Sequence, residues 1–480
     1  MEDFNTNNLY KKSVKSVFAL ISRSFFLNIL SYVASIVIFT YLRPSDVGIY
    51  VVIIAIQRII SFITDFGFGA ALIQKKEEIS EADIKTTFTL QIIITGTIFI
   101  FVISVQGLIA QYFSFNLVAM HLLLILVFTV FLSSFKVIPS ILLERKINFH
   151  KLILPQIIES IFFNSILVLL VIKGYGLESY SWAFLISGLI GIPFYYIVSP
   201  WRPKIGIDKK SLNNLRYGIQ FQAKNILATL KDDLLTLFLV KILSFNEIGF
   251  IGFGQRNAFF TYRYIVDSVT KVTFSTFSRL QENEKFLQKS IEKSLFYVSL
   301  AMFPFVFGII IISPQLISFM PKWQNKWEPA LLSLTFFSLN ALVSSMSGIL
   351  VNVLDATGRV KTTLKLMILW TILTWIFTWI GIFIFGYNGV AIASFIITLT
   401  IFITIRLVRE KIQFRFYHSV YKPFLASLIM AMLTYLGTIF FVTNLLSLFL
   451  VIIVSVLIYG VCIFLLAKKE VLQVMNLINN

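Results

Sequence analysis

The sequence predicts an all-α protein that crosses a membrane many times. Of its 480 residues, 58% are hydrophobic and 13% are charged. One membrane-crossing helix needs about 20 mainly apolar residues, so the hydrophobic residues suffice for about 14 crossings. This composition excludes a soluble enzyme with a single membrane anchor, a secreted disulfide-rich domain and a disordered chain. The two further observations that support the prediction are the spacing of the apolar runs and the placement of the basic residues.

Apolar runs separated by short polar interruptions predict about 14 helices. The longest predicted connection, Arg279–Lys293, is too short to hold a domain. The expected helices cover residues 17–41, 47–73, 86–110, 119–141, 153–173, 178–199, 213–240, 248–277, 294–319, 330–354, 364–385, 388–408, 422–443 and 445–467.

The basic residues alternate along this pattern of helices. The chain has 41 Lys and Arg against 23 Asp and Glu, a formal net charge of +18. In a soluble protein such an excess suggests a nucleic-acid partner, but cytoplasmic loops of membrane proteins also collect Lys and Arg. Most of the basic residues fall in every second connection, which predicts an even number of crossings, both termini in the cytoplasm and no nucleic-acid partner. The connections of the opposite side hold few: Arg43, Lys173, Lys241, Lys322 and Lys326.

Two short motifs recur in a way that predicts an internal repeat. Asp46-Val47-Gly48-Ile49 opens the second helix and Glu247-Ile248-Gly249-Phe250 opens the eighth. Six helices per copy is an even number, so both copies face the same way and form a parallel repeat. The predicted organisation is two six-helix bundles around a central cavity plus two C-terminal helices. The boundaries are 1–199 for the first bundle, 200–212 for a cytoplasmic linker, 213–408 for the second bundle and 409–480 for the two additional helices.

Several charged residues fall inside the predicted helices, where each is costly in lipid and normally faces a bundle interior or a water-filled cavity. Helical spacing places Arg256, Arg263, Asp267 and Lys271 on one face of the eighth helix. Lys224 lies on a similar stripe of the seventh helix. The complete set is Arg23, Arg58, Lys136, Lys224, Lys231, Arg256, Arg263 and Lys271 with the acids Asp65, Glu159, Asp232, Asp233 and Asp267.

The charged set predicts a cationic cavity that binds a substrate with two phosphates. Guanidinium groups stay charged when they are desolvated, and they fork onto phosphate oxygens. The candidate binding residues are Arg23, Arg58, Lys224, Arg256 and Arg263.

Simpler interpretations of the same charges stay open. The charges can form structural ion pairs such as Arg263–Asp267, or lie near a membrane interface, as is expected first for Lys136, Lys271 and the cluster 231–233. Asp65 and Asp267 are candidates either for coupling to Na⁺ or H⁺ or for ion pairing.

The rare residues predict no metal site and no disulfide. His121, His150 and His418 are far apart in sequence, and the single cysteine, Cys462, lies in an apolar run. These spacings match none of the usual metal-binding patterns. No cofactor is predicted apart from the coupling ion.

Three motifs resemble the Wzx-type polysaccharide transporters. Leu42-Arg43-Pro44-Ser45-Asp46-Val47-Gly48-Ile49-Tyr50 is similar to the loop that opens helix 2 in these proteins, and Asp65-Phe66-Gly67-Phe68-Gly69-Ala70-Ala71-Leu72-Ile73-Gln74 to the end of that helix. Leu354-Asp355-Ala356-Thr357-Gly358-Arg359 resembles a short loop after helix 10. The resemblance implies a member of the multidrug/oligosaccharidyl-lipid/polysaccharide exporter superfamily.

This resemblance implies a flippase in the bacterial cytoplasmic (inner) membrane. It would turn undecaprenyl-pyrophosphate-linked oligosaccharide, a repeat unit of O-antigen or another surface polysaccharide, across the membrane by alternating access. In the related lipid II flippase, arginines on helices 1, 2 and 8 face the cavity, and Arg23, Arg58, Arg256 and Arg263 occupy comparable helices here. The implied partners are this lipid-linked oligosaccharide and membrane lipid. A polysaccharide polymerase and assembly proteins are further candidate partners.

Two other functions are alternatives to the flippase. A multidrug exporter of the same superfamily typically carries organic cations, for which a positive cavity has the wrong sign. A membrane glycosyltransferase, polymerase or ligase needs a sizeable outer loop with catalytic acids. The richest outer loop here, Pro321–Pro329, contains only Glu328. The sequence therefore favours a transporter over an enzyme.

Overall fold

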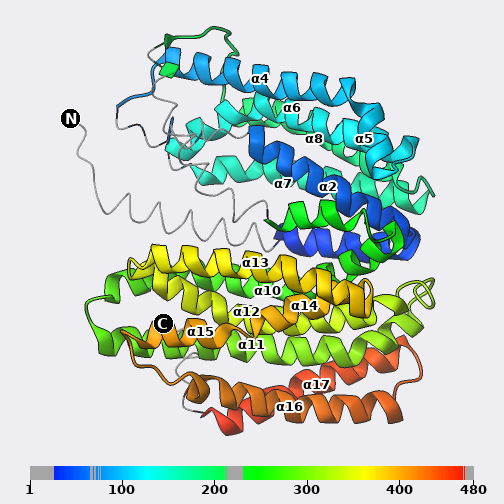
Figure 1. The fold of residues 1–480 in the computed structure, drawn as a ribbon, viewed down its shortest axis with the longest axis vertical. Coiled ribbons are helices and arrows are strands. Elements are labelled where there is room, and N and C mark those ends of the chain that lie inside the picture. Colours follow the sequence, from blue (N-terminus) through cyan, green and yellow to red (C-terminus); the bar gives the residue numbers. More distant parts are fainter. Residues whose placement is uncertain are drawn as a thin grey trace. The chain divides into compact units, whose positions relative to one another are not determined.

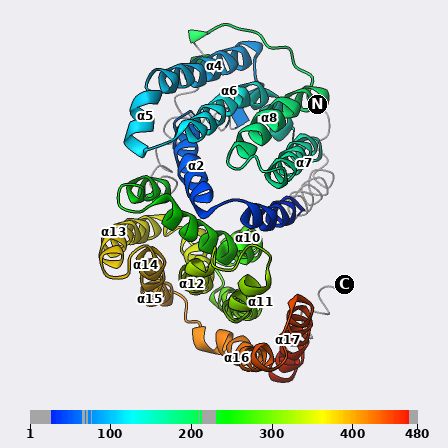
Figure 2. The same cartoon turned by 90° about the vertical axis from the view of Figure 1, so that its right-hand side faces the viewer.

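The computed structural model describes residues 26–64, 69, 72–73, 75, 77–146, 148–209, 211–212, 231–468 and 470, apart from the side chains at positions 264, 267, 268 and 271. Within these residues the chain forms helices and no strand. The chain divides into two compact units, Met1–Gly249 and Phe250–Asn480. Figures 1 and 2 draw the helices of each unit.

The first unit is a bundle of long helices. Its described elements are a helix over Phe26–Tyr41, α2 (Pro44–Thr64), α4 (Glu81–Ser104), α5 (Gln106–Phe113), α6 (Leu117–Arg145), α7 (Phe149–Ile172), α8 (Glu178–Val198), a helix over 231–239 and the first residues of α10 (Phe245–Leu280).

The second unit contains the rest of α10 and eight further described elements. These are α11 (Glu284–Phe319), the 3₁₀ turn η1 (Glu328–Ala330), α12 (Leu331–Ala356), α13 (Val360–Phe385), α14 (Asn388–Thr398) with α15 (Ile401–Arg409), α16 (Phe416–Phe440) and α17 (Leu445–Leu466).

Length and composition make this a multi-pass membrane protein. Among the described residues, 11 helices are long and apolar enough to cross a membrane, and Phe26–Tyr41 is a shorter apolar helix. The 36-residue helix α10 is also long enough, although it carries Arg256 and Arg263. The predicted all-α polytopic fold is therefore confirmed. The predicted boundaries at 199, 212 and 408 stay predictions.

One connection and two helices differ from the prediction. The connection expected at Arg279–Lys293 is mostly helical, because α10 runs to Leu280 and α11 already begins at Glu284. The Asn283 side chain accepts a hydrogen bond from the Phe286 N–H and caps α11, so the charged first turns continue the helix beyond its apolar part. The expected helix 86–110 is broken at Val105 and the expected helix 388–408 at Leu399–Thr400.

Each unit is organised around one central helix. In the first unit α6 packs against α4, α7, α8 and α2, and in the second α12 packs against α11, α14, α15 and α13. Half of the apolar stretch of each central helix is buried, the largest share among the spanning helices. These are the fourth and tenth predicted helices, which are equivalent positions in a repeat of six.

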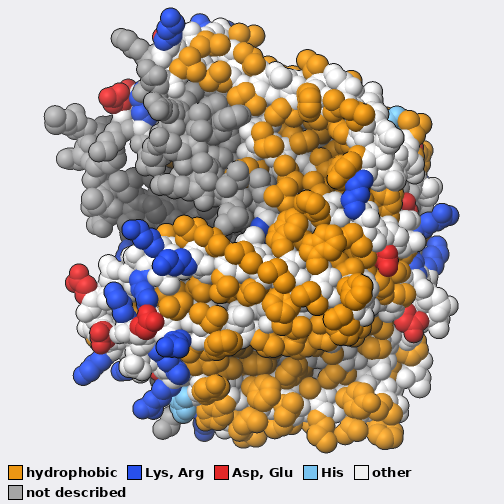
Figure 3. Space-filling model, viewed as in Figure 1, with side chains coloured by type: hydrophobic (Ala, Val, Ile, Leu, Met, Phe, Trp, Pro, Cys, Tyr) orange, Lys and Arg blue, Asp and Glu red, His pale blue; other side chains and the backbone are white. Residues whose placement is uncertain are grey.

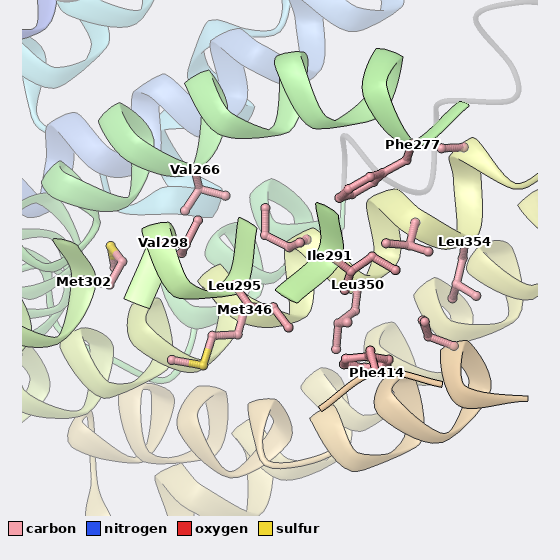
Figure 4. Packing of buried hydrophobic residues seen from close by; sticks show 14 of the residues in the cluster. Val266, Phe277, Ile291, Leu295, Val298, Met302, Met346, Leu350, Leu354 and Phe414 are labelled. Carbon is pink, nitrogen blue, oxygen red and sulfur yellow. The ribbon is translucent and has the colours of Figure 1, made fainter. Parts of the chain in front are cut away.

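A large apolar cluster lies around α12 in the core of the second unit. Phe277 of α10, Leu295 of α11 and Leu350 of α12 are fully buried in it, together with Phe414 from the connection before α16 (Figure 4). Because lipid tails are as apolar as these side chains, close van der Waals packing is what favours helix association here.

The first turns of α2 and α10 support the predicted repeat residue by residue. Asp46 accepts a hydrogen bond from the Arg43 N–H at 3.2 Å, and Glu247 accepts one from the Ser244 N–H at 2.7 Å. A Cβ on Gly48 would collide with the Phe245 carbonyl oxygen, and one on Gly249 would collide with that of Pro44. Corresponding residues of the two motifs therefore make reciprocal contacts, and only glycine permits the two backbones to approach so closely.

The predicted linker lies along α4. The Gly206 N–H donates to Thr89 Oγ1 and the Asp208 N–H donates to Thr86 Oγ1, each at 2.9 Å. Trp201 packs edge-on against Phe88. These contacts place the polar backbone of the linker on hydroxyl groups of α4 instead of leaving it unpaired.

The surface of the second unit has the distribution expected in a bilayer. Large apolar side chains such as Phe383, Phe440 and Leu465 are exposed on α13, α16 and α17. On the face shown in Figure 3, hydrophobic side chains cover the lengths of these helices, and basic side chains gather near helix ends. Extended apolar surfaces of this kind mark contact with a membrane.

Candidate functional site

Arg58 is the predicted binding residue that the structure describes in the first unit. It lies on α2 with its side chain 57% exposed, and its Nη1 is 3.3 Å from Oδ1 of Asp233, which is 7% exposed. Asp233 belongs to the helix over 231–239, where Lys231 Nζ is 3.5 Å from Asp232 Oδ1. The carboxylate of the buried Asp233 thus contacts one edge of the Arg58 guanidinium. The other N–H groups of Arg58 can donate to the oxygen atoms of an anion.

Arg256 and Arg263 lie on one face of α10. They are seven residues apart, which places them about 20° from each other around the helix axis, and both are exposed. Ile251 and Ala258 lie on the other side of the helix and are buried. The structure therefore brings the two arginines together on one exposed stripe, as the spacing predicts.

Polar contacts fix α10 within the second unit. The Asn352 side-chain amide on α12 donates to the Thr270 carbonyl oxygen at 2.9 Å and to Thr273 Oγ1 at 2.8 Å. A buried amide with both partners in place specifies one rotation of α10 against α12. That rotation sets the direction in which the arginine stripe faces.

The other predicted site residues are not covered. Arg23, Asp65 and Lys224 lie outside the described residues, and so does the side chain of Asp267. The expected ion pair Arg263–Asp267, the role of these residues in binding or ion coupling, and a shared cavity therefore stay predictions.

The structure adds an ion pair that the binding prediction did not include. Lys136 Nζ on α6 donates to Glu159 Oε1 on α7, with side chains 14% and 28% exposed. Lys136 is nine residues from the end of α6 at Arg145, which is about 14 Å along the helix. The expectation that Lys136 lies near a membrane interface stays a prediction. The sequence signal was present, since two opposite charges occurred inside predicted apolar helices.

The basic connections of the second unit meet at one end. Arg359, just before α13, donates to the Leu407 carbonyl oxygen and to Glu410 Oε2 at 2.8 Å, which joins the connections after α12 and α15. Lys422, near the start of α16, donates to Glu470 after α17. The Lys- and Arg-rich connections thus share a side, as the charge alternation predicts.

The described residues offer no group of three or more His, Cys, Asp and Glu that could hold a metal ion. These residues include arginines on exposed helix faces, whose N–H groups can donate to an anion. They also include an ion pair inside a helical bundle.

These features define a polytopic protein with the fold of the flippases and multidrug transporters. The chain is similar to the lipid II flippase MurJ in its inward closed conformation, with a TM-score of 0.77 and 17% identity over 94% of this chain and 100% of that one. It is also similar to an inward-facing multidrug resistance MATE family transporter of the MOP superfamily, with a TM-score of 0.63 and 15% identity over 80% of this chain and 95% of that one. The predicted class, a transport protein rather than an enzyme, agrees with these names.

The chain belongs to the family described as polysaccharide biosynthesis protein, whose sequence profile matches residues 15–332. A curated relative is the lipopolysaccharide biosynthesis protein WzxC of Escherichia coli (strain K12), which is 24% identical over 343 residues. That match covers 68% of this chain and 66% of WzxC, slightly less than two thirds of its length. Together these findings confirm the resemblance to Wzx-type transporters.

Proposed function

We propose that this protein is a flippase that moves undecaprenyl-pyrophosphate-linked oligosaccharide across the bacterial cytoplasmic membrane by alternating access. The observation that carries the proposal is the set of exposed arginines on α2 and on the long helix α10 of a chain in the polysaccharide biosynthesis protein family. In this proposal the protein does not catalyse a chemical reaction.

The arginines supply the recognition of the phosphates. A charged group at the bilayer centre costs several kcal/mol, so arginines on exposed helix faces are expected to face a hydrated path. Arg256 and Arg263 stand two helical turns apart on α10, about 10 Å along the axis, and Arg58 lies on α2. Each such donor can form charge-assisted hydrogen bonds with pyrophosphate oxygens, which compensate part of the lost hydration of the pyrophosphate.

The other parts of the substrate follow from their polarity. The oligosaccharide is polar and needs the hydrated interior of the protein, whereas the polyprenyl chain stays in lipid. The distribution of Lys and Arg supports a cytoplasmic position for the basic connections and, with them, for both termini. The substrate is then loaded from the cytoplasmic leaflet and released to the outer leaflet, where a polysaccharide polymerase would use it.

The fold alone also fits a multidrug exporter, but the charges argue against it. Drug transporters of this fold typically carry organic cations, and exposed arginines repel them. If deletion of the gene changed drug susceptibility and left surface polysaccharide intact, the drug-export function would be favoured instead.

The experiment is complementation of a strain that lacks the gene, with surface polysaccharide as the readout and membrane protein level as the control. The double variant Arg58→Ala, Arg263→Ala is expected to abolish export. Arg58→Lys, Arg263→Lys is expected to retain part of it, because lysine keeps the charge but not the bidentate geometry. Arg279→Ala, in the last turn of α10, is a matched control with normal export. Full export by the double alanine variant at normal protein level would contradict the proposal.

A further inference from the structure

Two helices of the first unit each place a charge inside their spans, and a third helix lies against these charges. Lys136 lies on α6, Glu159 is the eleventh of the 24 residues of α7, and Gly191 lies beside both on α8. Glu159 is about 15 Å along α7 from its first residue, half the thickness of a bilayer core of about 30 Å. The pair therefore lies at the level where an unpaired charge is most costly.

The surroundings make room for the pair. A Cβ on Gly191 would lie 3.0 Å from the Glu159 carboxylate and 3.2 Å from Lys136 Nζ, so α8 contacts the charges with bare backbone. Lys136 Nζ lies 5.9 Å from the centre of the Tyr195 ring. The side chain of Glu159 is 28% exposed, so the carboxylate is not sealed in the core.

Two features suit a carboxyl group that exchanges a proton. Gln156, one turn before Glu159 on α7, has a buried side-chain oxygen without a hydrogen-bond partner. A protonated carboxyl becomes a hydrogen-bond donor and can use such an acceptor, whereas a carboxylate cannot. In addition, Pro139 of α6, Pro155 of α7 and Pro193 of α8 lie within about one turn of the pair. A proline removes a backbone hydrogen bond and permits a helix to bend.

We propose that Lys136 and Glu159 form the proton-coupling site of the transporter. This inference rests on the proposed function and names the ion that drives it. While the pair is closed, Lys136 neutralises the carboxylate. When the proline-containing helices bend and separate the pair, Glu159 is a carboxylate without a counterion in an apolar bundle, where desolvation favours uptake of one proton from water. Release of that proton restores the pair.

The geometry selects a proton over a sodium ion. The ammonium of Lys136 already occupies the cation position at Glu159, so Na⁺ would have to displace it and find several further oxygen ligands. A proton needs one carboxylate oxygen and no coordination shell.

The titratable groups at the level of Glu159 on the helices packed against α7 are Lys136 on α6 and Tyr195 and Tyr196 on α8. The other titratable groups of α6, α7 and α8 lie elsewhere along these helices: His121, Glu144, Arg145, His150, Lys151, Glu178 and Tyr180.

The test uses everted membrane vesicles with the full-length protein and a fluorescent undecaprenyl-pyrophosphate oligosaccharide added outside. Translocation is measured as protection from a membrane-impermeant glycosidase, with an acidic lumen or after nigericin has removed the pH gradient. For one proton per lipid, a gradient of one pH unit corresponds to about a tenfold change in the distribution of the lipid.

The decisive variant is the double substitution Lys136→Met, Glu159→Gln, which removes both charges together and avoids leaving one unpaired. It is expected to fold and to translocate without any response to the gradient. Lys422→Met, Glu470→Gln removes a pair of the same residue types at the helix ends of the second unit and is expected to respond like the wild type.

Each outcome is informative. An unchanged gradient response in the interior double variant would show that the pair is structural and overturn the inference. A wild type that translocates with no gradient response would do the same and leave the proposed function standing. A wild type that does not translocate at all would overturn the proposed function and this inference with it.

Discussion

An ion pair inside the first unit and the ion pairs at helix ends of the second unit lie in different environments. In the first unit Lys136 and Glu159 pair near the middle of α6 and α7. In the second unit Arg359 pairs with Glu410, and Lys422 with Glu470, at helix ends. Charges at helix ends keep much of their hydration, whereas charges at mid-membrane depth do not. The costly placement in the first unit therefore indicates a functional role, and the placement in the second is explained by topology.

The largest expected effect is the loss of stability when the interior ion pair is broken. Glu159→Ala leaves the ammonium of Lys136, whose side chain is 14% exposed, without its partner inside the span, and an unpaired lysine at a helix centre costs about 2.5–3.5 kcal/mol on insertion scales. Glu470→Ala removes a partner whose side chain is 37% exposed at a helix end, where the ammonium of Lys422 can reach water, and is expected to cost about 0–1 kcal/mol. The free energy of unfolding in mixed micelles, measured by SDS titration, compares the two. Equal losses would show that the two pairs have equivalent environments.

A smaller effect is expected from the glycine that accommodates the interior pair. Gly191→Ala introduces a methyl group 3.0 Å from the Glu159 carboxylate, and overpacking of this kind typically costs about 1–3 kcal/mol. Gly188→Ala, one turn earlier on α8, meets its nearest atom at 3.7 Å, an ordinary contact, and is expected to be neutral or stabilising. The same titration distinguishes them. If Gly191→Ala is as stable as Gly188→Ala, α8 does not confine the pair.

The smallest expected loss of stability is at Asn283, which caps the start of α11, a helix start that the sequence did not predict. Asn283→Ala removes the hydrogen bond to the Phe286 N–H and should cost about 1 kcal/mol, since this is the usual loss for an N-cap. Asn283→Ser keeps an acceptor at this position and is the control. Thermal unfolding in nanodiscs provides the comparison. No difference between alanine and serine would mean that the cap does not stabilise α11.

The sequence predicts the spanning helices well because their signal is local. Runs such as Leu445–Leu466 and Leu117–Arg145 are apolar over a full membrane thickness and have helix caps at Asn444 and Asn116. The repeat could also be found, since Gly48 and Gly249 occupy the same place in two similar motifs.

The partners of the charged side chains could not be predicted in the same way. Arg58 contacts Asp233, which is distant in sequence, and Lys136 contacts Glu159 of the next helix. Which acid meets which base depends on the rotation and depth of each helix, and these are set by packing contacts such as Asn352 with Thr273. Composition also does not predict that α11 begins with charged turns, ahead of its apolar part.

The most direct test of the flippase function uses purified protein in liposomes that contain an undecaprenyl-pyrophosphate oligosaccharide. The readout is exposure of the glycan on the opposite leaflet to an impermeant lectin. The wild type is expected to expose it faster than protein-free liposomes, and the Arg58→Ala, Arg263→Ala variant is expected to match the protein-free rate. If the wild type does not exceed the protein-free rate, the proposal that this protein flips lipid-linked oligosaccharide is contradicted.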